Sequence, residues 1–171
     1  MAPPFRVPTG SQVTKLALKR AEVGDLVMAD EALRAAPFIK ALGAKHQDLL
    51  LHGTARRYPH NAVLFQQGDS GASLFFVLKG EVRLSARKGP DSVELGTATR
   101  GEVFGEAEIL SGETLRTSFA VAQTDVDAAE FPREAFLESG RLLHELATFL
   151  GPIKAARQTA LLEMTDFLNR W

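Results

Sequence analysis

The chain has 171 residues, a formal net charge of −1, 45% hydrophobic and 24% charged residues, and no cysteine. Its length and composition are typical of a soluble globular domain, and the lack of cysteine excludes disulfides, thiolate zinc sites and cysteine-ligated iron–sulfur clusters. The balanced charge gives no basic excess of the kind that binds nucleic acid. No signal peptide and no run of ~18–20 apolar residues is present, so we expect a cytoplasmic protein without a membrane partner.

The N-terminal part of the chain is predicted to be helical after a disordered start. Residues 1–11 are rich in Pro, Gly and small polar residues, a composition that favours disorder. Asp30 is a suitable N-cap for a short helix, which we expect to end at Pro37 because the residue before a proline disfavours the helical conformation. Helices are predicted over residues 13–28, 31–35 and 38–52.

From Thr54 onward, Gly and Pro recur every few residues and separate short apolar runs of strand length. Evenly spaced short strands with glycine turns are typical of an antiparallel barrel or jelly roll. The run Gly89-Pro90-Asp91 between two of these strands predicts a hairpin loop. The predicted strands cover residues 62–65, 74–78, 82–86, 93–98, 119–122 and 126–131.

The segment after Pro132 shows helical spacing of its apolar residues. Steps of three and four alternate along it, which is the pattern of a coiled-coil seam with Arg157 as a polar break. The seam predicts a parallel homodimer, and the alternative is that the same stripe folds back on the chain's own barrel. Gly151-Pro152 should kink or divide the helix. The seam comprises Leu143, Leu146, Leu150, Ile153, Arg157, Ala160, Met164, Phe167 and Trp171.

These elements predict an α+β fold, in which an antiparallel β-barrel (jelly roll) follows N-terminal helices and precedes a long C-terminal helix. The predicted organisation has three parts. Residues 1–36 form an N-terminal extension that is partly disordered or helical, residues 37–133 form the barrel, and residues 134–171 form the C-terminal helices, which serve as a lid and a dimer seam.

The run over residues 101–118 carries the most specific pattern in the chain. A strand-like pair enters Gly105, a helix-capable turn follows, and Arg116 opens a new strand. Unpaired N–H groups at a helix start favour an anion, Gly105 lets the backbone approach it, and Arg116 offers a cationic fork to phosphate oxygens. Glu106 repels a phosphate unless it accepts hydroxyl protons from a sugar. The pattern therefore indicates a sugar–phosphate site.

This run resembles the phosphate-binding cassette of cyclic-nucleotide-binding domains, the family of bacterial catabolite activator proteins and protein kinase A regulatory subunits. Upstream, the glycine-punctuated segments 63–69 and 74–82 are similar to the strands that open the family's barrel. The resemblance covers residues 36–171 and implies that the barrel is a cyclic-nucleotide-binding domain. It is carried by Phe104-Gly105-Glu106 and by Arg116-Thr117, ten residues after the glutamate.

The resemblance also implies roles for single residues. Glu106 would accept the ribose 2′-hydroxyl, Arg116 would pair with the cyclic phosphate, and the first helical N–H groups and Thr117 would complete the phosphate cage. Glu108 stands where the family usually has a small residue, and Ala107 where it usually has a larger apolar one. If Glu108 points inward, repulsion between its carboxylate and a phosphate about 4 Å away costs ~1–4 kcal/mol of binding free energy. The predicted ligand-binding residues are Phe104, Gly105, Glu106, Ala107, Glu108, Arg116, Thr117 and Ser118.

The expected ligand is cyclic AMP. Cyclic GMP is an alternative, because in the family a threonine directly after this arginine suits both cyclic mononucleotides. A cyclic dinucleotide is a further alternative. Hydroxyls at Thr117 and Ser118 can bond the phosphate or a guanine amino group. In the family the C-terminal helix covers the base. Candidates for that cover are Phe149, Leu150 and Arg157, since arginine stacks on rings.

The resemblance implies a stand-alone cyclic nucleotide sensor that relays binding to an unknown protein effector, through the C-terminal helix or the N-terminal extension. Family transcription factors carry a DNA-reading domain after the long helix. Only 21 residues follow Leu150, so no DNA partner is expected. The alternative is a degenerate barrel that acts as an interaction or scaffold module without a ligand. The four histidines show no metal-ligand spacing and no catalytic grouping is recognisable, so we expect no metal, no cofactor and no enzyme.

Overall fold

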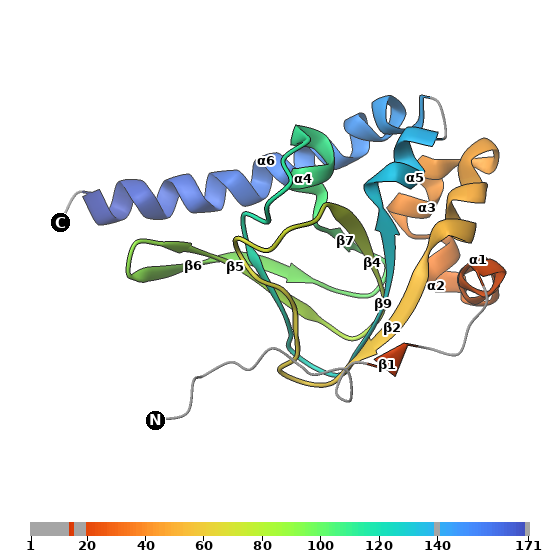
Figure 1. The fold of residues 1–171 in the computed structure, drawn as a ribbon, viewed down its shortest axis with the longest axis horizontal. Helices are drawn as coiled ribbons and strands as arrows, with labels where there is room; N and C mark the ends of the chain where they lie inside the picture. The colour runs from red at the N-terminus through yellow and green to blue at the C-terminus, as the bar shows by residue number, and fades with distance from the viewer. Residues whose placement is uncertain (1–13, 16–19, 139–140, 170–171) are drawn as a thin grey trace.

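The computed structural model describes residues 14–15, 20–138 and 141–169, whose strands form two antiparallel sheets (Figure 1). One sheet has the order β1-β2-β9-β4-β7 and the other the order β3-β8-β5-β6. The sheets face each other as a sandwich, and the described strands do not close into the expected barrel. The strands are β1 (Thr14–Lys15), β2 (Thr54–Tyr58), β3 (Val63–Phe65), β4 (Ser73–Lys79), β5 (Val82–Lys88), β6 (Asp91–Ala98), β7 (Val103–Phe104), β8 (Phe119–Ala122) and β9 (Val126–Pro132).

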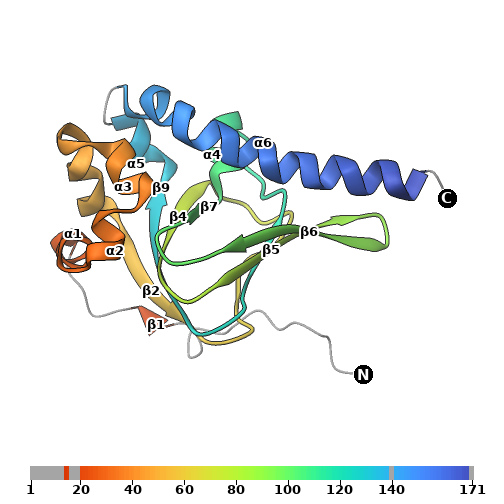
Figure 2. The same ribbon diagram turned by 180° about the vertical axis from the view of Figure 1, so that it is seen from behind.

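The helices gather at one end of the sandwich and along one side of it, as both views show (Figures 1 and 2). The N-terminal helices, α5 and the start of α6 share one hydrophobic cluster with the five-stranded sheet. The rest of α6 extends over α4 and strand β6. The helices are α1 (Arg20–Ala29), α2 (Glu31–Arg34), α3 (Pro37–Leu42), the 3₁₀ helix η1 (Ala44–His52), α4 (Glu106–Ser111), α5 (Arg133–Glu138) and α6 (Leu142–Asn169).

Strand β4 is the centre of the core because both of its faces are covered. Successive side chains of a strand point to opposite faces. Phe75 and Val77 therefore face the four-stranded sheet inside the sandwich, whereas Phe76 packs against the helices. The ring of Phe76 lies 5.3 Å from that of Phe38 in α3, which anchors the helical layer to the sheet.

The six predicted strands correspond to β3, β4, β5, β6, β8 and β9, with ends that agree within two residues. The predicted hairpin is also confirmed, because Lys88 pairs with Asp91 across Gly89-Pro90. Strand β2 was missed, since its sequence is polar. Its arginines Arg56 and Arg57 are paired across strands with Glu130 and Asp127 of β9, an arrangement that stabilises a strand without an apolar pattern.

The helix predictions need correction in two places. Residues 14–15 form β1, so the helix predicted over 13–28 begins only at Arg20. The helix predicted over 38–52 breaks at Gly43, where φ is +63°, and continues as η1. As expected, the short helix α2 ends before Pro37, at Arg34, and Ala36 is extended; Pro37 then begins α3, where its missing N–H is no loss. Of the two outcomes expected at Gly151-Pro152, a division of the helix does not occur, because α6 continues through Pro152. The disorder predicted for residues 1–11 lies outside the described residues.

The first four of the nine predicted seam residues pack in the chain's own helical core cluster. Leu146 and Leu150 have no exposed surface and belong to the helical core cluster. The start of α6 is also tied to η1, because Glu145 accepts hydrogen bonds from Lys45 and His46 at 2.9 and 2.7 Å. The side chains of Met164, Phe167 and Trp171 lie outside the described part of the chain. The homodimer and the three-part division therefore stay predictions. No helix within the described ranges has the length and apolar character of a membrane span.

Candidate functional site

A cavity of about 280 Å³ lies between the inner face of the four-stranded sheet, helix α4 and helix α6. Leu84 and Ala86 of β5 and Leu95 of β6 give it an apolar surface. Side chains of α4 and of the segment after it provide the polar side, and α6 covers it. The remaining lining residues are Gly105, Glu106, Ala107, Glu108, Ser111, Glu113, Thr117, Ser118, Lys154, Arg157, Gln158 and Leu161.

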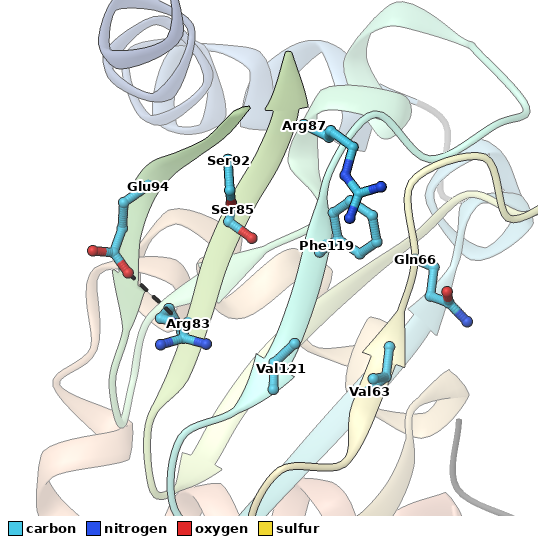
Figure 3. A pocket seen from close by; sticks show the side chains of 9 residues that line it. All are labelled: Val63, Gln66, Arg83, Ser85, Arg87, Ser92, Glu94, Phe119 and Val121. Carbon is cyan, nitrogen blue, oxygen red and sulfur yellow. Dashed lines mark ion pairs between the residues drawn. The ribbon is translucent and has the colours of Figure 1, made fainter. Parts of the chain in front are cut away.

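A larger hollow of about 430 Å³ lies on the opposite, outer face of the same sheet (Figure 3). Its β5 residues Arg83, Ser85 and Arg87 alternate with Leu84 and Ala86, which line the inner cavity. Its Arg83–Glu94 contact is long, at 3.9 Å, and both side chains are exposed. This hollow contains none of the residues predicted to bind a ligand, so the inner cavity is the candidate site.

Six of the eight predicted site residues line the inner cavity: Gly105, Glu106, Ala107, Glu108, Thr117 and Ser118. Phe104 does not, because its ring is fully buried inside the sandwich and stacks on Phe75 with 4.9 Å between ring centroids. Arg116 does not line the cavity either. The two predicted segments therefore meet at the cavity, but the side chains of Phe104 and Arg116 do not line it.

The turn that connects β7 to α4 requires a glycine at position 105. Gly105 has φ of +85°, in the left-handed region that other residues rarely adopt. A Cβ there would lie 2.6 Å from the carbonyl oxygen of Ser73 and 3.0 Å from Nη1 of Arg116. The glycine thus allows α4 to start directly against strand β4, which sets the positions of Glu106 and Glu108.

Arg116 is a buried residue, and both terminal nitrogens of its guanidinium donate hydrogen bonds to the protein. Its Nη1 donates to Oε1 of Glu108 at 3.1 Å, and its Nη2 donates to Oγ and to the carbonyl oxygen of Ser73 at 2.8 and 3.1 Å. The guanidinium carbon lies 4.1 Å above the centroid of the Phe65 ring. Arg116 is 4% exposed and Glu108 is 1% exposed, so this is an ion pair that water does not screen.

The side chain of Glu108 points inward. Its second oxygen, Oε2, accepts a hydrogen bond from the hydroxyl of Thr117 at 3.4 Å. Its carboxylate therefore contacts Arg116 and Thr117, the two side chains that the sequence assigned to a phosphate. Burial raises the pKa of Glu108, the pair with Arg116 opposes this shift, and the nearby charge of Glu106 adds to it.

The raised pKa of Glu108 predicts a pH-dependent stability. An acid whose pKa is higher in the folded state holds its proton more tightly there, so its contribution is fully present below its ordinary value of 4.5 and is lost as the pH rises through the raised value. Glu108→Gln should remove this decline from the pH profile of the free energy of unfolding, measured by urea titration. The exposed Glu113→Gln should leave it unchanged. A wild-type slope that survives in Glu108→Gln contradicts the assignment.

Glu106 and α6 are joined by a second ion pair. Nη1 of Arg157 donates to Oε2 of Glu106 at 2.6 Å, and its Nη2 donates to the carbonyl oxygen of Val103 at 3.1 Å. The Glu106 side chain is 4% exposed and that of Arg157 is 18% exposed. Arg157 was one of the three predicted cover residues. The other two, Phe149 and Leu150, pack in the helical core cluster and do not line the cavity.

Sequence reasoning missed three of the four α6 residues that line the cavity. Lys154, Gln158 and Leu161 lie one turn or less from Arg157, at spacings that place all four on one face of a helix. This spacing is the signal that could have found them once Arg157 was chosen. Among the residues that the structure describes, no three His, Cys, Asp or Glu side chains come together as metal ligands.

Residues 55–141, about half of the chain, match the cyclic nucleotide-binding domain family, and the chain belongs to this family. The cyclic AMP receptor protein of Thermus thermophilus is 34% identical over 127 residues, which cover 73% of this chain and 58% of that protein. A cyclic nucleotide-gated potassium channel of Mesorhizobium japonicum is 33% identical over 102 residues, which cover 59% of this chain and 27% of the channel. The resemblance to cyclic-nucleotide-binding domains found in the sequence is confirmed. The chain spans less than two thirds of the length of these two relatives.

The fold is also found in solved regulatory proteins. One is the regulatory subunit of a cAMP-independent protein kinase A from Trypanosoma cruzi, bound to guanosine, with a TM-score of 0.65. It is 19% identical to this chain, and the match covers 86% of this chain and 50% of that one. At this identity the likeness shows the fold alone.

Proposed function

We propose that this chain is a sensor in which a ligand of the cyclic nucleotide type enters the inner cavity and places its ribose on Glu106. One observation carries this proposal: Glu106 is buried at the cavity wall, and within the described residues its carboxylate forms one ion pair, with Arg157 of α6. A sugar hydroxyl that donates to Glu106 competes with Arg157 for the same carboxylate. Ligand binding and the state of α6 are thereby coupled.

The coupling gives the ligand a route to a partner protein. A ligand shifts a conformational equilibrium only by its differential affinity for the two states. Here the differential contact is the replacement of the Arg157–Glu106 pair by a ribose–Glu106 hydrogen bond, which frees Arg157 to stack on the base. Helix α6, or residues 1–36, would carry this change to a protein effector. A homodimer through the C-terminal part of α6 would be one form of that output.

Cyclic AMP is the expected cyclic nucleotide, with cyclic GMP as the alternative, because the hydroxyls of Thr117 and Ser118 can bond the phosphate or a guanine amino group. Ligands without a phosphate also belong in the test, because the Trypanosoma cruzi protein of this fold was solved with guanosine. A scaffold without a ligand is the second candidate function. It is favoured by the two ion pairs, since Arg116 and Glu106 are both satisfied by the chain's own Glu108 and Arg157.

Thermal unfolding with and without ligand separates these two functions. A ligand present at 100 times its Kd adds about 2.7 kcal/mol to the free energy of unfolding. We expect cyclic AMP, cyclic GMP, adenosine or guanosine to raise the midpoint of the wild-type chain, and Glu106→Gln to lose that rise. Arg87→Ala, on the outer face of the sheet (Figure 3), is the matched control and should keep it. If none of the four ligands raises the unfolding midpoint at millimolar concentration, the ligand-free scaffold is the remaining candidate function.

A further inference from the structure

We infer that Glu108 sets the ligand class of the inner cavity, so that the site takes an uncharged ribonucleoside in preference to the corresponding cyclic nucleotide. The inference rests on the proposed function, because the ribose must still bind at Glu106. It goes further in naming the chemistry that the rest of the site accepts. Three observations support it: the position of the Glu108 carboxylate, the charge balance of the cavity and the hydrogen bonds that each ligand class can make.

The first observation is that the cavity already contains its own anion. The Glu108 carboxylate contacts the Arg116 guanidinium and the Thr117 hydroxyl at 3.1 and 3.4 Å. Glu108 lines the cavity, whereas Arg116 does not. Nη1 also donates to the carbonyl oxygen of Gly105, and Nη2 donates to Ser73, whose hydroxyl in turn donates to Glu130 at 2.6 Å. An entering phosphate therefore meets a carboxylate, and no free guanidinium.

The second observation is the charge balance. Three carboxylates line the cavity, and three cations face them if the buried Arg116 is included with Lys154 and Arg157. The phosphodiester of a cyclic nucleotide adds a negative charge that this set does not compensate. Burying an uncompensated charge is unfavourable, because the charge loses its hydration without gaining a partner. A nucleoside carries no charge and leaves the balance intact. The three carboxylates are Glu106, Glu108 and Glu113.

The third observation concerns donors and acceptors. An ionised carboxylate only accepts hydrogen bonds, and so do the free oxygens of a phosphodiester, so the two groups cannot satisfy each other. A nucleoside has free 3′- and 5′-hydroxyls, which are donors, and cyclisation with phosphate removes both of them. Glu106 and Glu108 come two residues apart on α4 and both line the cavity. Two acceptors at the sugar end of the cavity match the hydroxyl groups of an open ribose.

Titration calorimetry at one pH and one ionic strength tests this inference through matched ligand pairs. We expect adenosine to bind the wild-type chain at least tenfold more tightly than cyclic AMP, or guanosine at least tenfold more tightly than cyclic GMP. Glu108→Gln removes the charge and supplies an amide donor, so we expect it to reduce this ratio at least tenfold, which equals about 1.4 kcal/mol. Glu94→Gln removes a charge from the exposed outer face of the same sheet, outside the inner cavity, and should leave the ratio within about threefold.

Each result bears on the inference without ambiguity. If the wild-type chain binds a cyclic nucleotide more tightly than its nucleoside and loses it in Glu106→Gln, the inference is overturned and the proposed function stands. If neither class binds the folded chain, both are overturned. If Glu108→Gln fails to fold, the wild-type affinity ratios of adenosine to cyclic AMP and of guanosine to cyclic GMP decide whether the inference holds. A ratio that changes equally in Glu108→Gln and Glu94→Gln would contradict the specific role of Glu108 and indicate a general charge effect.

Discussion

Arg116→Ala should lower the free energy of unfolding by about 3–5 kcal/mol, the cost of breaking a buried ion pair by removing one partner. The substitution leaves Glu108, which is 1% exposed, without its cation, and leaves Ser73 without its donor. Urea unfolding followed by circular dichroism measures the loss. This expectation differs from that for a surface ligand arginine, whose removal changes binding and leaves stability almost unchanged.

A double-mutant cycle provides the control for this prediction. If the pair carries the effect, Arg116→Ala combined with Glu108→Ala should be less destabilised than the sum of the single variants, because neither charge is then left unpaired. The free energy of unfolding of Arg116→Lys should lie between those of the wild type and Arg116→Ala. The ammonium group keeps the positive charge but lacks the planar fork that reaches both Glu108 and Ser73. A loss below about 1 kcal/mol for Arg116→Ala would contradict the buried pair.

Gly105→Ala should both destabilise the fold and weaken ligand binding. An alanine at φ of +85° costs about 1–2 kcal/mol, and its Cβ, 2.6 Å from the Ser73 carbonyl oxygen, adds about 1–3 kcal/mol of overpacking. Relief of that contact moves the start of α4 and with it Glu106. We therefore expect at least a tenfold loss of affinity in calorimetry, beside the lower midpoint of thermal unfolding.

Gly112→Ala is the matched control for Gly105→Ala. Gly112 closes α4 with φ of +76°, and a Cβ there has 3.5 Å to its nearest neighbour, Nη2 of Arg133. It carries the conformational cost without the clash, so it should be less destabilising by about 1–3 kcal/mol and should keep its affinity. Equal effects of the two substitutions would show that the approach of α4 to β4 is not what holds the site.

The sandwich could be predicted from the sequence because its signals are local. Glycine and proline punctuate short apolar runs, and each run became a strand with ends within two residues of the prediction. Strand β2 has no such signal, since it is held by Arg56 and Arg57 through partners on β9, more than sixty residues away. The helix α3 and the 3₁₀ helix η1 were predicted as one helix for the opposite reason: Phe38, Leu42 and Leu49 have helical spacing, but Gly43 interrupts the backbone between the two elements.

The candidate site could be predicted only in so far as it is contiguous in sequence. The run from Gly105 to Ser118 forms one wall of the cavity, and six of its predicted residues line it. The α6 side of the cavity depends on a contact between Arg157 and Glu106, which are 51 residues apart. The direction of the Glu108 side chain depends on Ser73 of β4, because Ser73 holds Arg116 in place. Neither relation leaves a pattern in the sequence near the cassette.

Discrimination between a ribose and a 2′-deoxyribose tests most directly whether a ligand sugar binds at Glu106. Calorimetry would compare adenosine with 2′-deoxyadenosine, and cyclic AMP with its 2′-deoxy analogue, on the wild-type chain and on Glu106→Gln. A hydrogen bond to a charged group contributes about 1.5–3 kcal/mol, so the wild-type chain should prefer at least one of the ribose ligands about tenfold or more, and Glu106→Gln should lose most of that preference. Equal affinity for both members of each pair, or a preference that survives in Glu106→Gln, would contradict the account.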